Sequence, residues 1–560
     1  MSVKQFDPLL YIEPYRGKSF TGEWPTLPEM IDITVDKFSA KTAFRAFTPE
    51  ERAFSYGELQ RLCRQIAAYL CESGIEKGDR VGVTGKNSPE WGIAYLSVLY
   101  AGAVVVPIDY ALTKEEASGL LNRAGVKALF ADGEVLDYYR KEHGSEYAVY
   151  SLVPGRDDFI LGLEAQGEVI PALPEENDLA AILFTSGTTG VAKGVMLTHK
   201  NFVSDCYLAQ GNMNIFDTDV FYALLPLHHS YTMLAVFIEG LSVGSEIIFG
   251  SSLVVSQLLK ELKEGKVTMF LGVPLLFNKI IKSLMKGIRE KGLLVYGLIK
   301  TMMFISGTIK KITGKNVGKA MFGGILDKVS LRTNRICISG GGPLPASTFR
   351  MYNQLGIDFV QGYGLTETSP ILCLNPTYAF NVNSVGKIIP GVEGKIFDPD
   401  EEGVGEFCVK GPMVMQGYYL DVEATDKVID REGWFHTGDM GFVDNKNYLH
   451  LTGRAKSIIV TEGGKNVFPE EIEDKFQLYD EIEQILVRGF ILDKKMKTEG
   501  IEALIYPVQD GKLDISEDRM NNIISEVNRE LRPYQKITRI TVLAEPMEMT
   551  STKKIKRFTV

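Results

Sequence analysis

Short hydrophobic runs alternate with amphipathic helical stretches along most of the first 450 residues. Segment 55–73, SYGELQRLCRQIAAYLCES, carries apolar residues at helical spacing, and two apolar runs of strand length follow at 79–85 and 102–109. Apolar runs of this length, bounded by glycine and charged residues, are typical of buried strands in layered α/β proteins. The pattern therefore predicts an α/β fold for most of the chain.

The pattern changes near Lys456. Segment 467–492, VFPEEIEDKFQLYDEIEQILVRGFIL, predicts a helix followed by a strand, and the later segments suggest a compact α+β unit. We therefore expect a large N-terminal α/β domain of several subdomains, 1–455, and a small C-terminal α+β domain, 456–560. A chain of 560 residues has room for both, because single cores seldom exceed about 250–300 residues.

Composition narrows the class of protein. A net charge of −10 argues against a generally basic nucleic-acid binder, so we expect no nucleic-acid partner. The six cysteines contain no CxxC pair, which predicts reduced thiols and neither a zinc site nor a disulfide framework.

The first twenty residues lack the apolar core of a secretory signal, and no uncharged apolar run reaches about 18 residues. We expect a cytoplasmic protein without a membrane-spanning helix.

One segment is strongly basic. Residues 279–335 contain thirteen lysines and arginines but only Glu290 and Asp327 as acids, so this stretch carries +11 and the rest of the chain −21. Within it, 292–311 predicts an amphipathic helix. Its polar arc contains Thr301, Lys300, Thr308 and Lys311, and its apolar face Val295, Leu298, Ile299, Met302, Ile305 and Ile309, with Phe304 off the pattern. Peripheral contact with an anionic membrane surface and a core helix with solvated lysines explain this pattern equally well.

A loop rich in glycine and hydroxyl groups follows the predicted strand 179–184. Gly187, Gly190 and Gly194 allow close approach of backbone N–H groups to an anion, four hydroxyl side chains add donors, and Lys193 supplies a positive charge. The spacing differs from the Walker A pattern, in which the two glycines stand further apart. The loop still predicts a polyphosphate site.

Two more apolar strands end in similar loops. Segment 335–345, RICISGGGPLP, runs into three glycines, and 356–370, GIDFVQGYGLTETSP, offers a tyrosine, two threonines and Glu367. Ligands of open α/β sheets collect beyond the carboxyl ends of strands, so the three loops are expected to line one cleft. An acidic side chain beside a phosphate loop is a plausible ligand for Mg²⁺.

Eight motifs in order carry a family resemblance from Thr185 to Lys554. They are TSGTTGVAKGV, LPLHHSY, SGGGPL, QGYGLTET, WFHTGDMG, TGRAKSIIV, GGKNVFPEEIE and TSTKKIKR. The chain resembles the adenylate-forming superfamily, which includes acyl-CoA synthetases, luciferases and the adenylation domains of peptide synthetases. The resemblance implies a two-domain fold and an enzyme that uses ATP and Mg²⁺ to form an acyl-adenylate.

The resemblance also implies roles for single residues. Its phosphate loop would comprise Thr185, Ser186, Gly187, Thr188, Thr189, Gly190 and Lys193, with Thr185 and Glu367 placing Mg²⁺. Gly340, Gly341, Gly342 and Tyr363 would line the adenine pocket, with Gly364 and Thr366 also in the nucleotide site. Asp439 and Arg454 would bind the ribose hydroxyls. His229 would lie near the acyl carboxylate, whereas we interpret His228 as a core histidine.

Further roles fall in the small domain. By resemblance, Lys554 would reach the α-phosphate, although Lys553 stands where the family usually has glycine and leaves open which lysine acts. Lys456 matches the family's hinge, about which the small domain would turn to bring 462–465, including Gly464, towards the pantetheine thiol.

The basic segment resembles an extra segment of long-chain fatty acyl-CoA synthetases. It implies a fatty acid substrate, CoA as acceptor and peripheral contact, through 279–335, with the inner face of the membrane, where each basic residue contributes about 1 kcal/mol. An acyl carrier protein is the rival acceptor, because carrier proteins are acidic. A non-catalytic lipid-binding protein at the membrane surface is the alternative from another class.

Overall fold

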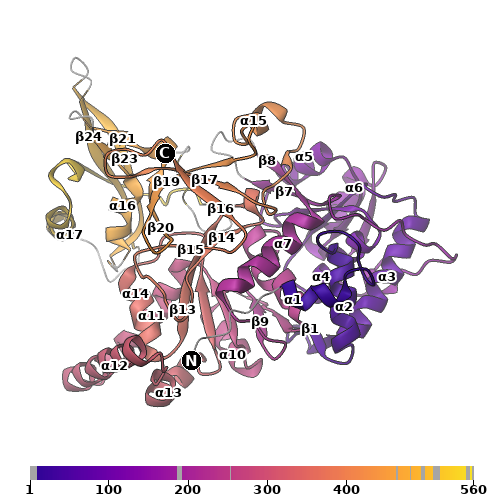
Figure 1. Ribbon diagram of the computed structural model, residues 1–560, viewed down its shortest axis with the longest axis horizontal. Coiled ribbons are helices and arrows are strands. Elements are labelled where there is room, and N and C mark those ends of the chain that lie inside the picture. The colour runs from indigo at the N-terminus through magenta and orange to yellow at the C-terminus, as the bar shows by residue number, and fades with distance from the viewer. Residues whose placement is uncertain are drawn as a thin grey trace.

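A computed structural model describes residues 9–185, 192–252, 254–461, 465–477, 479, 481–493, 498–508, 517–549, 555 and 557. The chain forms a large N-terminal domain, which contains two sheets, and a smaller C-terminal domain, which lies at the upper left of the view in Figure 1, coloured light orange to yellow. This mixed α/β architecture confirms the fold class predicted from the sequence.

Seven strands form one sheet of the large domain, in the order β18-β8-β7-β4-β3-β5-β6. The pairs from β7 to β6 are parallel, and β8 is antiparallel to both β7 and β18. The strands are β3 (Arg80–Thr84), β4 (Val104–Ile108), β5 (Val126–Ala131), β6 (Ala148–Ser151), β7 (Leu179–Thr185), β8 (Lys193–Thr198) and β18 (Gly417–Tyr418). β3, β4 and β7 confirm three of the predicted strands.

A second sheet takes thirteen strands of the described chain, in the order β16-β17-β19-β20-β15-β14-β13-β12-β11-β9-β10-β1-β2. Its parallel centre is β10 (Glu246–Phe249), β9 (Val220–Ala223), β11 (Met269–Gly272), β12 (Ile336–Ser339) and β13 (Asp358–Gly364), with β1 (Thr42–Ala46) and β2 (Arg52–Ser55) at one end. The antiparallel part is β14 (Ile371–Leu374), β15 (Gly386–Ile388), β16 (Glu393–Phe397), β17 (Gly405–Lys410), β19 (Phe435–Val443) and β20 (Tyr448–Arg454).

Several helices of the large domain begin at residues whose side chains satisfy the first N–H groups. Thr26, Ser55 and Thr113 each accept from the backbone of a glutamate three residues later, whose carboxylate accepts in return. The helices are α1 (Leu9–Ile12), α2 (Leu27–Phe38), α3 (Tyr56–Glu72), α4 (Pro89–Tyr100), α5 (Lys114–Ala124), α6 (Gly133–His143), α7 (His199–Ala209), α8 (Ser230–Thr232), α9 (Glu239–Val243), α10 (Val255–Glu264), α14 (Ala346–Leu355) and α15 (Val422–Asp426). α3 matches the helix predicted at 55–73, and a π-helical stretch, Met233–Ile238, joins α8 to α9.

The small domain has a hydrophobic core of its own, which includes Ile459, Ile472, Ile505 and Ile524. Its elements are β21 (Ile459–Val460), β22 (Asn466–Val467), α16 (Pro469–Glu473), β23 (Ile482–Asp493), β24 (Thr498–Pro507), α17 (Glu517–Glu530) and β25 (Arg539–Val542). α16 followed by β23 confirms the predicted helix and strand. The boundary near Lys456 stays a prediction.

The basic segment forms three helices, α11 (Pro274–Arg289), α12 (Leu293–Thr313) and α13 (Gly318–Lys328). α12 packs on α14 and α11. It is long and apolar enough to cross a membrane by length and composition, which the sequence criterion missed because Lys300 interrupts the apolar run. Within α12, Met303 and Ser306 are buried, whereas Leu298 and Ile305, from the predicted apolar face, are exposed.

Candidate active site

Asp439 and Arg454 form an ion pair at the centre of the candidate site. They face each other across the antiparallel β19–β20 pair, and Arg454 Nε lies 2.7 Å from Asp439 Oδ1. The Asp439 side chain is largely buried, while almost half of the Arg454 side chain is exposed. A carboxylate fixed beside a partly exposed guanidinium offers both acceptors and donors to a pair of hydroxyl groups.

Tyr363, from the end of β13, completes this cluster. Its hydroxyl donates to Asp439 Oδ2 at 2.6 Å, and burial together with that carboxylate raises the pKa of Tyr363 well above its ordinary value. The phenol therefore stays protonated and keeps donating. At the neighbouring Gly364, a Cβ atom would lie 1.5 Å from the carbonyl oxygen of Pro370, so no side chain fits between β13 and the segment after it.

The first of the glycines after β12, Gly340, packs against Tyr231, and this loop leaves the same edge of the sheet as the loop after β13. A Cβ on Gly340 would lie 2.8 Å from the Tyr231 ring, and Gly341 has a φ of +78°, which favours glycine. The Tyr231 hydroxyl donates to Ile338 O at 3.2 Å. Gly340 is thus held against the Tyr231 ring, and Gly341 and Gly342 have only Val273 and Pro274 atoms within 4 Å of the position of a Cβ.

The predicted phosphate loop connects β7 and β8 as a hairpin. Thr185 is paired with Lys193 across the two strands, and its Oγ1 donates to Lys193 O at 3.4 Å. Ser186, Gly187, Thr188, Thr189 and Gly190 lie outside the described residues. A hairpin between antiparallel strands differs from the strand–loop–helix of a Walker A site, as the spacing of the glycines predicts.

Tyr418 joins Lys193 to Glu367. Strand β18 places the Tyr418 ring 4.5 Å from Lys193 Nζ, and the Tyr418 hydroxyl donates to Glu367 Oε1 at 2.9 Å. Burial and the Glu367 carboxylate raise the pKa of Tyr418, so this phenol also remains a donor. The turn Thr366–Thr368, which carries Glu367, lies against β8.

The donor set around this turn fits Mg²⁺. Glu367 supplies a half-buried carboxylate, and Thr185, at the start of the hairpin, supplies a hydroxyl oxygen. Mg²⁺ prefers hard oxygen ligands, few of them from protein and the rest from phosphate and water. On the other side of the turn, Thr366 Oγ1 lies 3.0 Å from Ser230 Oγ, which joins the turn to the helix after His229.

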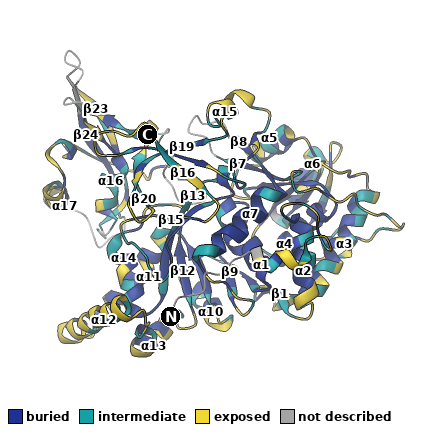
Figure 2. Ribbon diagram, viewed as in Figure 1, coloured by how far each residue is buried: buried dark blue, intermediate teal, exposed yellow. Residues whose placement is uncertain are grey.

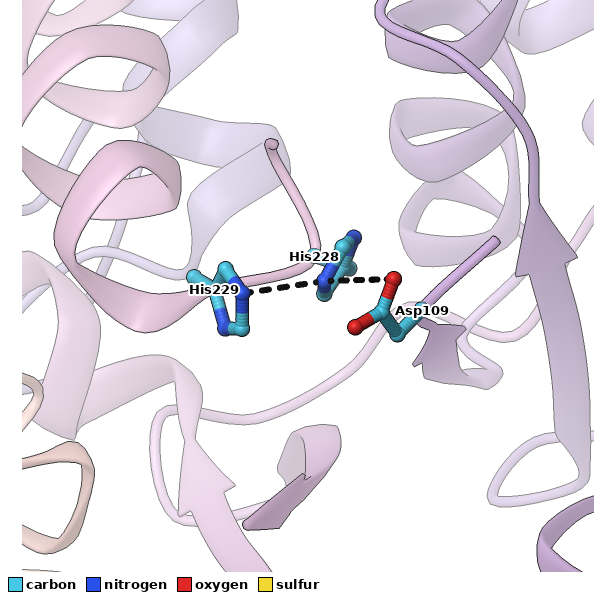
Figure 3. A group of neighbouring side chains, drawn as sticks. All are labelled: Asp109, His228 and His229. Atoms are coloured by element: carbon cyan, nitrogen blue, oxygen red, sulfur yellow. Dashed lines mark hydrogen bonds and ion pairs between the residues drawn. The ribbon is translucent and has the colours of Figure 1, made fainter. Parts of the chain in front are cut away.

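His229 belongs to a chain of three polar side chains (Figure 3). His228 Nε2 lies 3.1 Å from His229 Nε2 and 3.4 Å from Asp109 Oδ1, so His228 stands between the other two. His228 is buried, as a core histidine would be, and His229 is half-buried. Asn87 fixes their loop, because its side chain donates to Ala223 O and Leu225 O and accepts from Leu227 N.

The small domain lies against the large domain near the glycine loop. Gln477 Nε2 donates to Pro343 O at 3.3 Å, directly after Gly342. Lys456 is exposed in the short turn Ala455–Ser457, next to Arg454. Gly464, Lys553 and Lys554 lie outside the described residues, although Ile555 packs with Leu486 and Leu504 of the small domain.

The structure thus brings Tyr363, Asp439 and Arg454 into one cluster, and it links Lys193 with Glu367. It adds three positions that the sequence analysis did not single out: Asn87, Asp109 and Tyr418. Asp109 follows a buried strand in the same way as the predicted loops do, and this signal could have identified it. Asn87 and Tyr418 act through contacts between segments far apart in the chain, which no local pattern shows.

Comparison with known proteins assigns this chain to a protein family. Residues 31–419 match the family described as AMP-binding enzyme. A long-chain-fatty-acid–CoA ligase of Rattus norvegicus is 26% identical over 487 residues, which cover 81% of this chain and 67% of that protein. A feruloyl-CoA synthase of an Amycolatopsis species is 30% identical over 481 residues, covering 82% of this chain and 85% of that protein.

Solved structures show the same fold. The anthranilate CoA ligase AuaEII in complex with anthranoyl-AMP aligns with a TM-score of 0.78 at 20% identity, covering 96% of this chain and 97% of the other. ATP-bound MatB from Rhodopseudomonas palustris aligns with a TM-score of 0.76 at 24% identity, covering 96% and 98%. Both alignments span the large and the small domain.

Proposed function

Because the chain belongs to the AMP-binding enzyme family, we propose that it joins a long-chain fatty acid to CoA through an acyl-adenylate. At the coarser level it is an AMP-forming acid–CoA ligase that uses ATP and Mg²⁺. The identity of the acid is the finer part of the proposal, because relatives of similar identity are named for fatty and for aromatic acids.

The observation that carries adenylate formation is the cluster of Tyr363, Asp439 and Arg454. In the proposed complex, Asp439 accepts from the ribose hydroxyls of ATP and Arg454 donates to them, while Tyr363 holds the carboxylate in place. The adenine lies along Gly340–Gly342, whose lack of side chains leaves its face accessible. This arrangement orients the nucleotide before any bond changes.

The phosphates then extend towards Lys193 and Glu367. Lys193 offsets phosphate charge, and Glu367 and Thr185 hold Mg²⁺, which offsets more. The carboxylate of the acid attacks the α-phosphorus and pyrophosphate leaves. We place His229 beside that carboxylate and assign Lys554 to the α-phosphate, because two approaching anions need positive charge between them.

One structural feature supports a fatty acid over an aromatic acid. α12 exposes large apolar side chains beside a basic surface, and a poorly soluble acid is most concentrated at lipid surfaces. Free thiols at all six cysteines agree with the cytoplasmic location that we propose.

A ladder of fatty acids, with 4-coumarate and ferulate beside them, tests the proposal. We expect AMP and pyrophosphate to form with ATP, Mg²⁺ and CoA, and kcat/KM to rise with chain length. Turnover of the aromatic acids alone would overturn the fatty acid assignment, and no AMP with any acid would overturn the whole proposal. Competition between CoA and an acyl carrier protein in one assay decides the acceptor; preference for the carrier would contradict CoA.

A further inference from the structure

Helix α12 presents an apolar strip at the edge of the molecule. The strip consists of Leu294, Leu298, Ile305 and Ile312, with Phe304 beside them. Successive members of the strip are one or two helical turns apart, so their side chains lie on one face of the helix. Leu294 is 92% exposed and Ile312 77%. Figure 2 shows α12 as a largely exposed helix that projects from the large domain. Nothing in the described chain covers this face.

The polar side chains within the strip are satisfied by the helix itself. Thr301 Oγ1 donates to Gly297 O at 3.0 Å, and Thr308 Oγ1 donates to Phe304 O at 2.9 Å. A threonine bonded in this way needs no water for its hydroxyl. Thr301 lies between Leu298 and Ile305 in the strip, and Thr308 lies between Ile305 and Ile312. The outer face of the helix can therefore be buried in an apolar environment without leaving these two hydroxyl donors unpaired.

Basic side chains surround the strip. Lys286, Arg289 and Lys291 are exposed at the end of α11, and Lys300, Lys311 and Lys315 are exposed on α12 and directly after it. Lys291 stands close enough to Lys328 to lower the pKa of Lys328. The segment 279–335 carries +11 on a chain of −10, and although Lys310 and Arg335 are paired with Asp358 and Asp219, its exposed basic side chains are complementary to an anionic layer and repel a second copy of the same surface.

Two hydrogen bonds and two buried side chains keep α12 in the fold. Lys310 Nζ lies 2.6 Å from Asp358 Oδ1 and 2.7 Å from Asn353 Oδ1, and Met303 and Ser306 are buried against the domain. Crossing a bilayer would break all of these contacts and leave Asp358 without its lysine. A helix held on one face and apolar on the other is built to lie along a lipid surface.

We propose that α12 docks this protein on an anionic lipid bilayer. Leu294, Leu298, Phe304, Ile305 and Ile312 enter the boundary between headgroups and acyl chains, and the surrounding lysines bind the headgroup phosphates through their long side chains. This docking goes beyond the catalytic assignment, because it requires neither ATP nor an acid.

Flotation of the full-length protein with vesicles, without substrates, tests the docking. One set contains phosphatidylcholine alone, and the other about one third phosphatidylglycerol. We expect binding to the anionic vesicles that weakens with added salt. Failure of the wild-type protein to bind them would overturn the proposal, while the acid ladder would still report on the enzyme separately.

Two variants with matched controls locate the contact. The variant Leu294→Ser/Leu298→Ser/Ile312→Ser should lose at least about tenfold in partitioning, whereas Ile170→Ser/Leu173→Ser/Leu420→Ser, which changes equally exposed apolar residues elsewhere, should not. Equal losses in both would overturn the proposal.

The charge variant Lys300→Gln/Lys311→Gln/Lys315→Gln should lose about 100-fold on anionic vesicles and little on neutral ones. Its control is Lys141→Gln/Lys260→Gln/Lys427→Gln, three exposed lysines elsewhere. Lys310 stays unchanged in every variant. If the charge variant lost binding to an acidic carrier protein but not to vesicles, or if the apolar variant dissociated a dimer instead, the bilayer would be the wrong partner.

Discussion

Asp439 illustrates how single side chains in this site are held by their neighbours. Its carboxylate accepts from Tyr363 and pairs with Arg454, and its backbone N–H donates to Thr437 Oγ1 at 3.1 Å. The carboxylate is therefore oriented before the nucleotide arrives. Orientation of this kind is lost when the charge is removed, even if the shape of the side chain is kept.

Asp439→Asn should lower kcat/KM for ATP by about 10- to 100-fold, because hydrogen bonds to a charged group contribute about 1.5–3 kcal/mol each. Steady-state kinetics with ATP varied measures this loss. Asp444→Asn is the matched control, since Asp444 lies on the same β19–β20 hairpin and bonds only within the turn and to His450. Similar losses in both variants would mean that Asp439 acts by stabilising the hairpin.

Glu239 predicts a pH dependence of stability. Burial raises its pKa from an ordinary 4.5 to about 8. The folded protein therefore holds a proton that the unfolded chain releases, so the contribution of Glu239 is complete below pH 4.5 and is lost as pH rises to about 8. Burial also raises the pKa of the nearby Asp205, which adds to this slope.

Glu239→Gln should reduce the fall in the free energy of unfolding between pH 5 and pH 8, by a few kcal/mol across the window. Urea unfolding at several pH values measures the change. Glu264→Gln, an exposed position on α10, serves as the control. An unchanged slope in Glu239→Gln would contradict the assignment.

At the scale of elements, the spacing of hydrophobic residues predicted the strands and helices whose apolar side chains are all buried on the same face. β3, β4, β7 and α3 lie where apolar spacing placed them. The loops after β12 and β13 also follow their predicted strands. The expectation that all three loops line one cleft stays a prediction.

The remaining features depend on contacts between distant segments. The sequence left open whether the apolar face of α12 lies on a membrane surface or in the core; in the structure Met303 and Ser306 are buried, whereas Leu298 and Ile305 of that face are exposed. Hydrophobic spacing identifies the apolar face of the helix, but not which side of it packs on α14 and α11. β18 is only two residues long, so its pairing with β8, which positions Tyr418, has no sequence signal.

Lys310 should anchor α12 with measurable energy. Lys310→Ala leaves Asp358 without its lysine, and we expect a loss of about 2 kcal/mol in the stability of the large domain, less than for a fully buried pair. Lys311→Ala, one residue away and exposed, should change stability by less than about 0.5 kcal/mol. Thermal unfolding of both variants compares them, and equal values would show that the ion pair contributes nothing.

At the scale of the whole molecule, the two domains have separate hydrophobic cores, and the hinge movement implied by the family resemblance stays a prediction. The described contacts between them include the hydrogen bond from Gln477 to Pro343 and an exposed pair, Arg532 and Glu402, at 3.7 Å. Weak contacts of this kind suit a domain that turns during the reaction. Lys456 lies in the connection between the two cores.

Substitutions at Lys554 and Lys456 should affect the two half-reactions, adenylate formation and thioester formation, to different extents. Lys554→Ala should suppress formation of the acyl-adenylate and leave thioester formation from supplied acyl-adenylate largely intact, whereas Lys456→Pro should impair the second step more than the first. Pyrophosphate exchange and thioester release measure the two steps. Lys553→Ala and Lys456→Ala are the matched controls. If both steps fell together in folded Lys554→Ala, or if Lys553→Ala reproduced its effect, our assignment of Lys554 would be wrong.

The bond between Lys310 and Asp358 has a geometric consequence. Asp358 is the first residue of β13, and the other end of that seven-residue strand, Gly364, lies about 20 Å away and leads into the turn that carries Glu367. If α12 is bound to a lipid bilayer, β13 fixes the distance between the bilayer surface and the phosphorus atom that reacts. The acyl chain of a sufficiently long fatty acid then remains in the bilayer while its carboxylate reacts. A short acid has to leave the bilayer completely before it can react.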